Sequence, residues 1–439
     1  MAFLEIKNTG PIKNVSFNLN KINFFIGPQS SGKSTIAKII SFCLWLEKDV
    51  LIHQKVDYID SAFLDKNLLA FHQLKDCFTD ESYIKYESDI IKFEYLNSDF
   101  HIQEAAGFKV GKVGKNAYIP AERNIITLPG IITLPLGDTN IKSFISDWIN
   151  IHNKYNQEHT YSLLNLGIRY YYNEKLKQDT LILENGNEIS LERASSGLQS
   201  VVPLMLYVDY LTNWIYEHET DTSVEIKKKI ELTIFREFVR SFKDYSSLSD
   251  KEIDELYKNE DTKNVFKSSF ENIKNFNIEF KGYAMKPFEP VIELEDKIIR
   301  PHFSNIIIEE PEQNLFPKTQ VDLIKYLLQK INKERDVLTI TTHSPYVLYA
   351  LNNCMLGSLV QDNIEDDEML KIHQNSWVDP KFVSVWALTS EGTFLSMADQ
   401  TNHSIQDADG LIRKNYLDDA MKSIMAEFNN LLNYYEPNE

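Results

Sequence analysis

The chain has 439 residues, and its 46 Lys and Arg against 64 Asp and Glu give a formal net charge of −18. At about 150 residues per domain, this length predicts two to three structural units. Hydrophobic residues make up 43% of the chain and charged residues 25%, which is ordinary for a globular protein and excludes disordered and collagen-like classes. The acidic balance also means that any contact with nucleic acid has to be local.

The cysteines and the N-terminal residues indicate the compartment. Cys43, Cys77 and Cys354 form no CxxC pair, which favours a reducing compartment and argues against a zinc module. Glu5 and Lys7 interrupt the segment where a signal peptide needs an apolar core, and no run of eighteen apolar residues occurs. We therefore expect a cytoplasmic protein without membrane contact.

The N-terminal half mixes strands and helices. Strands are predicted at 3–7, 15–19 and 22–26, and the last runs directly into a glycine-rich turn. A helix is expected from Lys33 to about Trp45, further helix at 55–80, and short antiparallel strands within 82–120. Asn185-Gly186-Asn187 predicts a hairpin between 181–184 and 188–191, because Asn-Gly tolerates the positive φ of such a turn.

The C-terminal half begins with a mainly helical region from 198 to about 275. The apolar runs SNIII at 304–308 and VLTIT at 337–341 are separated by a predicted helix, a pattern typical of parallel strands in a βαβ unit. A strand pair near 383–396 and a helix at about 414–434 complete the prediction.

A phosphate-binding motif follows the third strand. GPQSSGKS at 27–34 matches G-x-x-x-x-G-K-[ST] between a strand and a helix, whereas a plain glycine-rich turn is the alternative. Backbone N–H groups and the helix N-terminus would hold the phosphates of ATP, Lys33 would reach the β- and γ-phosphate oxygens, and Ser34 would bind Mg²⁺. The predicted ATP-binding residues are Gly27, Pro28, Gln29, Ser30, Ser31, Gly32, Lys33, Ser34 and Thr35.

Two later strands end in polar residues suited to hydrolysis. NIIIEEPE at 305–312 supplies Glu309 for the Mg²⁺ shell and Glu310 to orient the attacking water. Acids after an apolar strand often form only a solvated loop, but the phosphate-binding motif favours the site. His343 in TTHSP at 341–345 is placed to contact the γ-phosphate, although a lone His at a strand end is often an ordinary polar residue.

A fourth motif, ASSGLQS at 194–200, opens a predicted helix. Hydroxyls, a glycine and free N–H groups at a helix start form an anion site, here one for the γ-phosphate bound to a second subunit. The residues expected to make this contact are Ser195, Ser196, Gly197 and Gln199. An ordinary helix N-cap has the same composition, so this motif is weak alone.

Together, these motifs and YIPAERN at 118–124 resemble the ABC/SMC-type ATPase head, and more narrowly the overcoming-lysogenization-defect-like (OLD-like) ATPases of bacterial anti-phage systems. The resemblance implies an α/β fold, an ABC-type P-loop ATPase head with an antiparallel β subdomain and a helical insertion between the signature and the Walker B strand. The implied units are an N-terminal ATPase lobe at 1–200, the insertion at 201–295 and a C-terminal lobe at 296–439.

The resemblance also implies a slow ATPase that forms a head-to-head homodimer around two nucleotides and controls a separate effector. Systems similar to PARIS or Septu suggest a nuclease as that effector, and we expect none in the 96 residues after His343. Asn314-Leu315-Phe316-Pro317 departs from the family's usual His-Leu-His-Pro D-loop. Glu122 and Arg123 are candidates for a γ-phosphate or Mg²⁺ contact, with a structural ion pair as the alternative.

Two other functions compete with this one. A DNA-repair ATPase of the RecF/Rad50 type would clamp DNA, and Lys229, Arg236, Arg240 and Lys243 fall near one face of the predicted helix 224–243, where they could follow a phosphate backbone. The alternative for that face is a solvated surface of mixed charge. The other function is a structural protein that binds nucleotide and hardly hydrolyses it.

Overall fold

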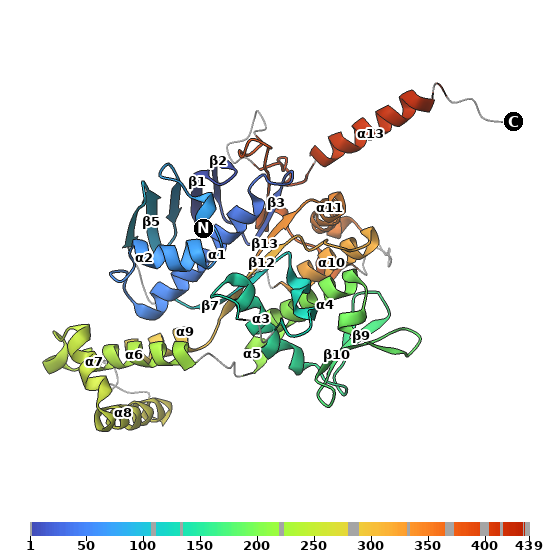
Figure 1. The fold of residues 1–439 in the computed structure, drawn as a ribbon. Helices are drawn as coiled ribbons and strands as arrows, with labels where there is room; N and C mark the ends of the chain where they lie inside the picture. The colour runs from blue at the N-terminus through green and yellow to red at the C-terminus, as the bar shows by residue number, and fades with distance from the viewer. Residues whose placement is uncertain are drawn as a thin grey trace.

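The computed structural model describes residues 2–106, 111–131, 135–218, 224–279, 289–331, 334–364, 373–395, 404–412, 416–432 and 434. Within these ranges the fold is mixed α/β, with one parallel and two antiparallel sheets (Figure 1). No helix in the described ranges has both the length and the apolar character needed to cross a membrane.

A parallel sheet of five strands forms the centre. Its order is β14 (Val383–Ala387), β3 (Ile22–Ile26), β13 (Val337–Thr342), β12 (Phe303–Glu309) and β7 (Gly114–Ile119). All neighbouring pairs are parallel. The predicted βαβ unit is confirmed, and because every strand runs the same way, the chain segments after all five strands leave at one edge of the sheet.

Two expectations for strands were wrong in part. Within the region 82–120, where antiparallel strands were expected, residues 114–119 form β7, which pairs in parallel with β12 at the edge of the central sheet. In the tail, 383–387 pairs in parallel with β3, and only an isolated bridge joins Leu388 to Phe394. Short apolar runs do not distinguish the two sheet types, because the partner strand is distant in sequence.

The antiparallel sheets flank the centre. The first has the order β2 (Ile12–Asn18), β1 (Phe3–Thr9), β4 (Tyr83–Glu87), β5 (Ile91–Leu96) and β6 (Asp99–Glu104). The second has the order β11 (Glu188–Ser190), β10 (Gln178–Ile182), β9 (Ile168–Asn173) and β8 (Tyr161–Leu163). The predicted hairpin between β10 and β11 is confirmed, and Gly186 has a φ of 82° in its turn.

Alternation along the central strands divides the core into two layers. Phe25 and Ile307 pack with α1 (Lys33–His53) and the first antiparallel sheet. Phe24 and Ile306, one residue earlier in their strands, point to the other face. The helices in that second layer are α3 (Asn140–Ile151), α4 (Ser196–Asp209), α10 (Pro317–Lys330) and α11 (Pro345–Val360).

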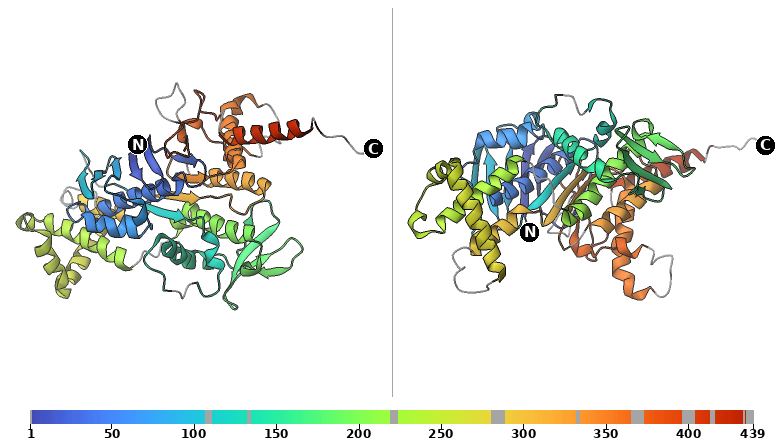
Figure 2. Two further views of the ribbon diagram at one scale, coloured as in Figure 1. Left: turned by 45° about the horizontal axis from the view of Figure 1, so that its top comes forward. Right: turned by 90° about the horizontal axis from the view of Figure 1, so that it is seen from below.

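Helix α1 connects the phosphate motif to a separate helical cluster. It is 21 residues long, roughly 30 Å at 1.5 Å per residue, and extends well beyond the predicted end at Trp45. Leu51 and Ile52 near its C-terminus pack with the buried face of the cluster. Its helices are α6 (Val224–Arg240), α7 (Asp250–Lys258), α8 (Glu260–Glu279) and α9 (Glu289–Ile299), which lie to one side of the molecule (Figure 2).

The packing also locates where that helical cluster starts. Residues 201–211, expected in the insertion, pack with the central sheet through α4 and the turns after it. The separate cluster therefore consists of described residues from 224 onward. The region predicted as helix at 55–80 contains α2 (Ser61–Leu64) followed by a π-helical turn at 65–70. A short α5 (Ile215–Glu217) precedes the cluster, and α13 (Tyr416–Leu432) extends away from the body on the other side in Figure 1.

Candidate nucleotide-binding site

The phosphate motif forms the turn between β3 and α1. Gly32 is the N-cap of α1 with a φ of 99°, and a Cβ there would lie 2.6 Å from Cγ1 of Ile12. Both the positive φ and this close approach require glycine at this position. Ser31 and Thr35 are buried, whereas Gln29, Ser30 and Ser34 are exposed at the start of the helix. The backbone N–H groups of this turn are thus arranged as an anion site at a helix N-terminus.

Lys33 extends back over the loop that precedes it. Its Nζ donates hydrogen bonds to the carbonyl oxygens of Gly27 at 2.9 Å and Pro28 at 2.7 Å. Burial lowers the pKa of Lys33 to about 8, while the negative charges of Glu310, Glu312 and Glu309 act in the opposite direction. The ammonium therefore stays mainly protonated at neutral pH and places a cation where phosphate oxygens would lie.

Glu309 ends β12 beside the start of α1. Its Oε1 accepts a hydrogen bond from the Tyr118 hydroxyl at 2.5 Å, and its carboxylate is also hydrogen-bonded to Ser34. Burial raises the pKa of Glu309, and the bonds from Tyr118 and Ser34 and the charge of Lys38 counteract that shift. A serine hydroxyl and a carboxylate in contact are hard oxygen donors, so these two residues fit a Mg²⁺ ion held partly by water and phosphate.

Glu310, the next residue, points toward the neighbouring strand end. Its backbone has a φ of 44°, and its Oε1 lies 3.0 Å from Nε2 of His343. The hydrogen bond from His343 is the main cause that lowers the pKa of Glu310, so its carboxylate remains ionised at neutral pH. An ionised, half-exposed carboxylate bonded to an imidazole suits the orientation of a water molecule.

Glu312 holds this arrangement together, and sequence reasoning did not assign it a role. Its Oε1 accepts hydrogen bonds from the Thr342 hydroxyl at 2.8 Å and from the backbone N–H of His343 at 2.7 Å. Burial raises the pKa of Glu312, and these two bonds oppose that rise. The acid fixes the loop that carries His343 relative to Glu310. The only sequence signal was a third acid directly after Glu-Glu-Pro.

Arg123 has neither of the roles expected for it. The side chain is fully buried, and its nitrogen atoms donate to five backbone carbonyl oxygens. The acceptors are the carbonyl oxygens of Ser200 at 3.1 Å, Pro120 at 3.3 Å, Glu309 at 2.9 Å, Glu310 at 2.8 Å and Pro311 at 3.2 Å. Arg123 is therefore a clamp between β7, α4 and the loop after β12, while Glu122 beside it is exposed.

The signature motif sits at the N-terminus of α4. Ser195 is the N-cap with extended backbone angles, and no side-chain capping bond is formed there. Ser195 and Ser196 are both exposed, so their hydroxyls and the helix N-terminus are accessible to another molecule. Gln199 instead donates to the carbonyl oxygens of Leu191 at 3.3 Å and Glu192 at 2.8 Å. In this geometry Gln199 supports the preceding turn and does not face outward as expected.

Gly197 places the signature motif against the segment 314–317. A Cβ on Gly197 would lie 2.8 Å from the carbonyl oxygen of Asn314, closer than a side chain can approach backbone. Asn314 itself has a φ of 62°, and the Phe316 side chain just before α10 is 74% exposed. The signature and the loop after the acids therefore form one continuous surface.

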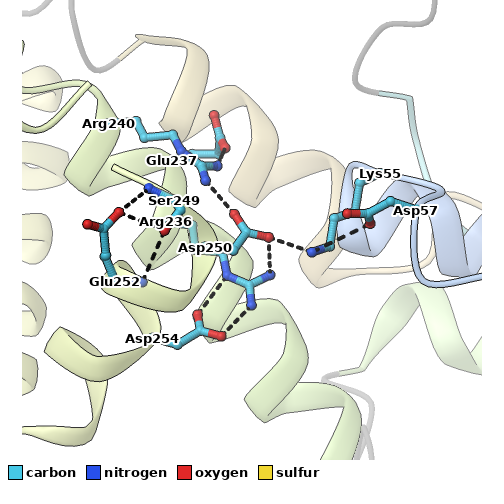
Figure 3. Close-up of polar contacts among 9 residues, drawn as sticks. All are labelled: Lys55, Asp57, Arg236, Glu237, Arg240, Ser249, Asp250, Glu252 and Asp254. Carbon is cyan, nitrogen blue, oxygen red and sulfur yellow. Dashed lines mark hydrogen bonds and ion pairs between the residues drawn. The ribbon is translucent and has the colours of Figure 1, made fainter. Parts of the chain in front are cut away.

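Two of the four residues on the predicted basic face of helix 224–243, Arg236 and Arg240, are paired with acids (Figure 3). Arg236 donates to both carboxylate oxygens of Asp254 at 2.9 and 2.8 Å, and Arg240 is paired with Asp250. Asp250 also accepts from Lys55 at 2.5 Å. The acids of α7 thus occupy the two arginines expected to follow DNA, which was not visible in the sequence of one helix. The side chain of Lys243 lies outside the described residues.

Comparisons with known proteins give likenesses of fold. No protein-family model and no curated protein matches the chain. Among solved structures, the SMC head domain from Thermotoga maritima is 10% identical with a TM-score of 0.30, covering 79% of this chain and 90% of that one. The recombination mediator RecF is 11% identical with a TM-score of 0.28, covering 90% and 97%.

A third solved structure is the dimeric ABC transporter cassette MJ0796, which is 11% identical with a TM-score of 0.22 and covers 90% of this chain and 97% of that one. These identities and TM-scores limit the likenesses to the mixed α/β fold. The functional assignment has to rest on the site itself.

Proposed function

We propose that this protein binds ATP with Mg²⁺ and hydrolyses it slowly. The observation that carries the proposal is the division of labour between two consecutive acids, since Glu309 is bonded to Ser34 and Glu310 to His343. Both acids lie at the sheet edge where the phosphate-binding turn also begins. A P-loop hydrolase needs one carboxylate for the metal and one for the water.

The residues of the chain then have separate tasks. The turn 27–32 and Lys33 bind the β- and γ-phosphates, which neutralises part of their charge. Ser34 and Glu309 would hold Mg²⁺, which when bound stabilises the charge that develops on the phosphate oxygens. Glu310 orients and accepts a proton from the attacking water, and His343 keeps that carboxylate ionised and in place.

We further infer that ATP closes a head-to-head homodimer. The support is the exposed N-terminus of α4 at Ser195 and Ser196, which has the features of an anion site. Helix α4 packs on the opposite face of the central sheet from α1, so this anion site is separate from the phosphate-binding turn of the same chain and is available to a second subunit. Through the motif resemblance, the proposed biological role is that of a sensor and scaffold in anti-phage defence that controls a separate nuclease. The DNA clamp has less support, because the arginines proposed to follow DNA are paired with acids of α7.

The test uses two substitutions, with matched controls at exposed residues of the turn between β9 and β10. Lys33→Ala should lower ATP affinity about 100-fold, since charge-assisted bonds contribute about 1.5–3 kcal/mol each, whereas Lys175→Ala should not. Glu310→Gln should keep ATP binding, lose about 10²- to 10⁴-fold in turnover and accumulate as a dimer in sedimentation with Mg·ATP, with Glu174→Gln as control.

Normal turnover by Glu310→Gln would remove Glu310 as the base, and unchanged binding by Lys33→Ala would remove the nucleotide site. Mass spectrometry of proteins that co-purify with tagged Glu310→Gln from the native host tests the proposed role. A stoichiometric nuclease supports it, whereas DNA and repair factors alone would favour the clamp.

A further inference from the structure

A cavity lies beside α1 and away from the phosphate-binding turn. Its volume is about 270 Å³, and residues of α1, β7, α3 and α4 line it together with the turn that follows α2. Ser41 of α1 lies in its wall, seven residues or roughly 10 Å along the helix from Ser34. None of the residues predicted to bind ATP lines it.

Aromatic rings form much of the wall. Phe144 of α3 and Tyr207 of α4 are stacked with ring centroids 5.5 Å apart and an angle of 16° between their planes. The His72 ring meets Phe71 and Tyr118 edge to face, with ring centroids 4.9 Å and 5.7 Å apart, respectively. Flat side chains in parallel and perpendicular orientations favour a flat occupant that offers a ring face to some and a ring edge to others.

Two buried nitrogen atoms in this wall have no hydrogen-bond partner in the described part of the chain. They are Nδ1 of His72 and Nδ2 of Asn116. The Oδ1 atom of the same Asn116 side chain is used, because it accepts from Asn305 at 2.7 Å. A buried polar atom without a partner costs about 1–3 kcal/mol. Both nitrogens are almost fully covered by protein, so an occupant recovers that cost only if the His72 and Asn116 side chains turn toward the cavity.

The buried part of the cavity wall is close to electrically neutral. Burial lowers the pKa of His72 to about 3, so the imidazole is uncharged at neutral pH. The Asp147 carboxylate is paired with Lys115 at 3.2 Å and also accepts a hydrogen bond from Tyr207. The other lining acid, Asp138, is exposed to solvent. The buried part of the wall thus offers no counter-charge to an anion, and its groups favour an uncharged ligand.

We propose that this cavity binds a small, neutral, planar heteroaromatic molecule of the nucleobase or nucleoside class. Such a molecule offers faces for the aromatic rings and, on one edge, a carbonyl or ring nitrogen to accept from Asn116 and a polar group for His72. The volume lies just below the usual range of about 300–1,000 Å³ for small-molecule sites, which fits one or two rings and excludes a nucleoside triphosphate.

The site is separate from the proposed ATP site but connected to it through Tyr118. This residue lines the cavity and donates its hydroxyl to Glu309. Because none of the predicted ATP-binding residues lines the cavity, binding there can be measured without an assay of hydrolysis. A failure of this proposal can thus be distinguished from a failure of the ATPase proposal.

The experiment measures binding of adenosine, guanosine, cytidine and uridine to the full chain by saturation-transfer NMR and equilibrium dialysis. We expect at least one nucleoside to bind and to remain bound when saturating Mg·ADP is added. The cavity variant is Ser143→Trp, which puts a large ring on an exposed lining position of α3, and the control is Ser146→Trp on an exposed position of the same helix outside the cavity.

Ser143→Trp should lower the affinity at least tenfold and Ser146→Trp should leave it unchanged. His72→Phe, which keeps a flat ring and removes the nitrogens, should lower it about three- to tenfold, the worth of one hydrogen bond. The proposal is overturned if no nucleoside binds, if Mg·ADP displaces the bound nucleoside, or if Ser143→Trp binds as well as the unmodified protein.

Discussion

Replacing Arg123 by methionine should destabilise the protein more than any surface substitution. The change removes a buried cation and leaves five backbone carbonyl oxygens without their donor. Counting only the three bonds of 3.1 Å or less, at about 1 kcal/mol for each oxygen left unsatisfied, predicts a loss of at least about 3 kcal/mol. Burial lowers the pKa of Arg123 to about 10, so the guanidinium is charged at neutral pH and these bonds are charge-assisted.

The assay is urea unfolding followed by tryptophan fluorescence, with Arg169→Met on the exposed face of β9 as the matched control. The control should change the free energy of unfolding by less than about 0.5 kcal/mol. Arg123→Lys keeps the charge but can make at most three of the bonds, so it should fall between Arg123→Met and the unmodified protein. It also provides a measurement if Arg123→Met does not fold.

A local measurement separates the clamp from general packing. The backbone N–H of Glu310 donates to Thr341 at 2.9 Å in the loop that Arg123 holds, and its hydrogen exchange should accelerate in Arg123→Lys. Two results together would contradict the role of Arg123 as the link between the three segments. They are a loss in the free energy of unfolding below about 1 kcal/mol in Arg123→Met and unchanged hydrogen exchange at Glu310 in Arg123→Lys.

Three further substitutions test neighbouring parts of the argument. Tyr118→Phe removes a hydrogen bond that lowers the pKa of Glu309, so that pKa should rise further and the acidic limb of the ATPase pH profile should move to higher pH. Gly197→Ala places a Cβ 2.8 Å from the Asn314 carbonyl oxygen, which should cost about 1–3 kcal/mol in thermal unfolding and weaken ATP-driven dimerisation. The unmodified protein should lose stability when Asp250 is protonated at acidic pH, because the pKa of Asp250 is lowered from 3.8 to about 2. Asp250→Asn should not show this acid-dependent loss.

The sign of the last prediction follows from the direction of that shift. A carboxyl whose pKa is lower in the folded state stabilises the protein fully above its unfolded pKa, and this contribution disappears as the pH falls from about 4 to 2. Acid titration of unfolding therefore compares the unmodified protein with Asp250→Asn, and identical curves would contradict the role of the network in Figure 3. If Tyr118→Phe leaves the acidic limb of the ATPase pH profile unchanged, the proposed contact with Glu309 is contradicted. If Gly197→Ala dimerises with ATP as well as the unmodified protein does, the proposed role of the close approach to Asn314 is contradicted.

Local patterns determined the elements that depend on local chemistry. The turn at 27–34 could be predicted because glycine, lysine and serine at fixed spacing serve a backbone geometry contained within eight residues. The Asn-Gly hairpin and the βαβ unit followed from turn chemistry and apolar runs in the same way. The acids at 309 and 310 were assigned from their position at a strand end, and the structure places them beside Ser34 and His343.

Tertiary structure decided the features that need partners distant in sequence. Arg123 lies 77 residues from Ser200 and 186 from Glu309, so no local pattern could show that it bonds to their carbonyl oxygens. The acids that neutralise Arg236 and Arg240 come from another helix, and β7 joined the central sheet through a strand some 190 residues away. Sequence alone fixes which groups can bind phosphate, because that chemistry is local. Packing decides which charges remain free to act, because burial and pairing depend on what lies across the fold.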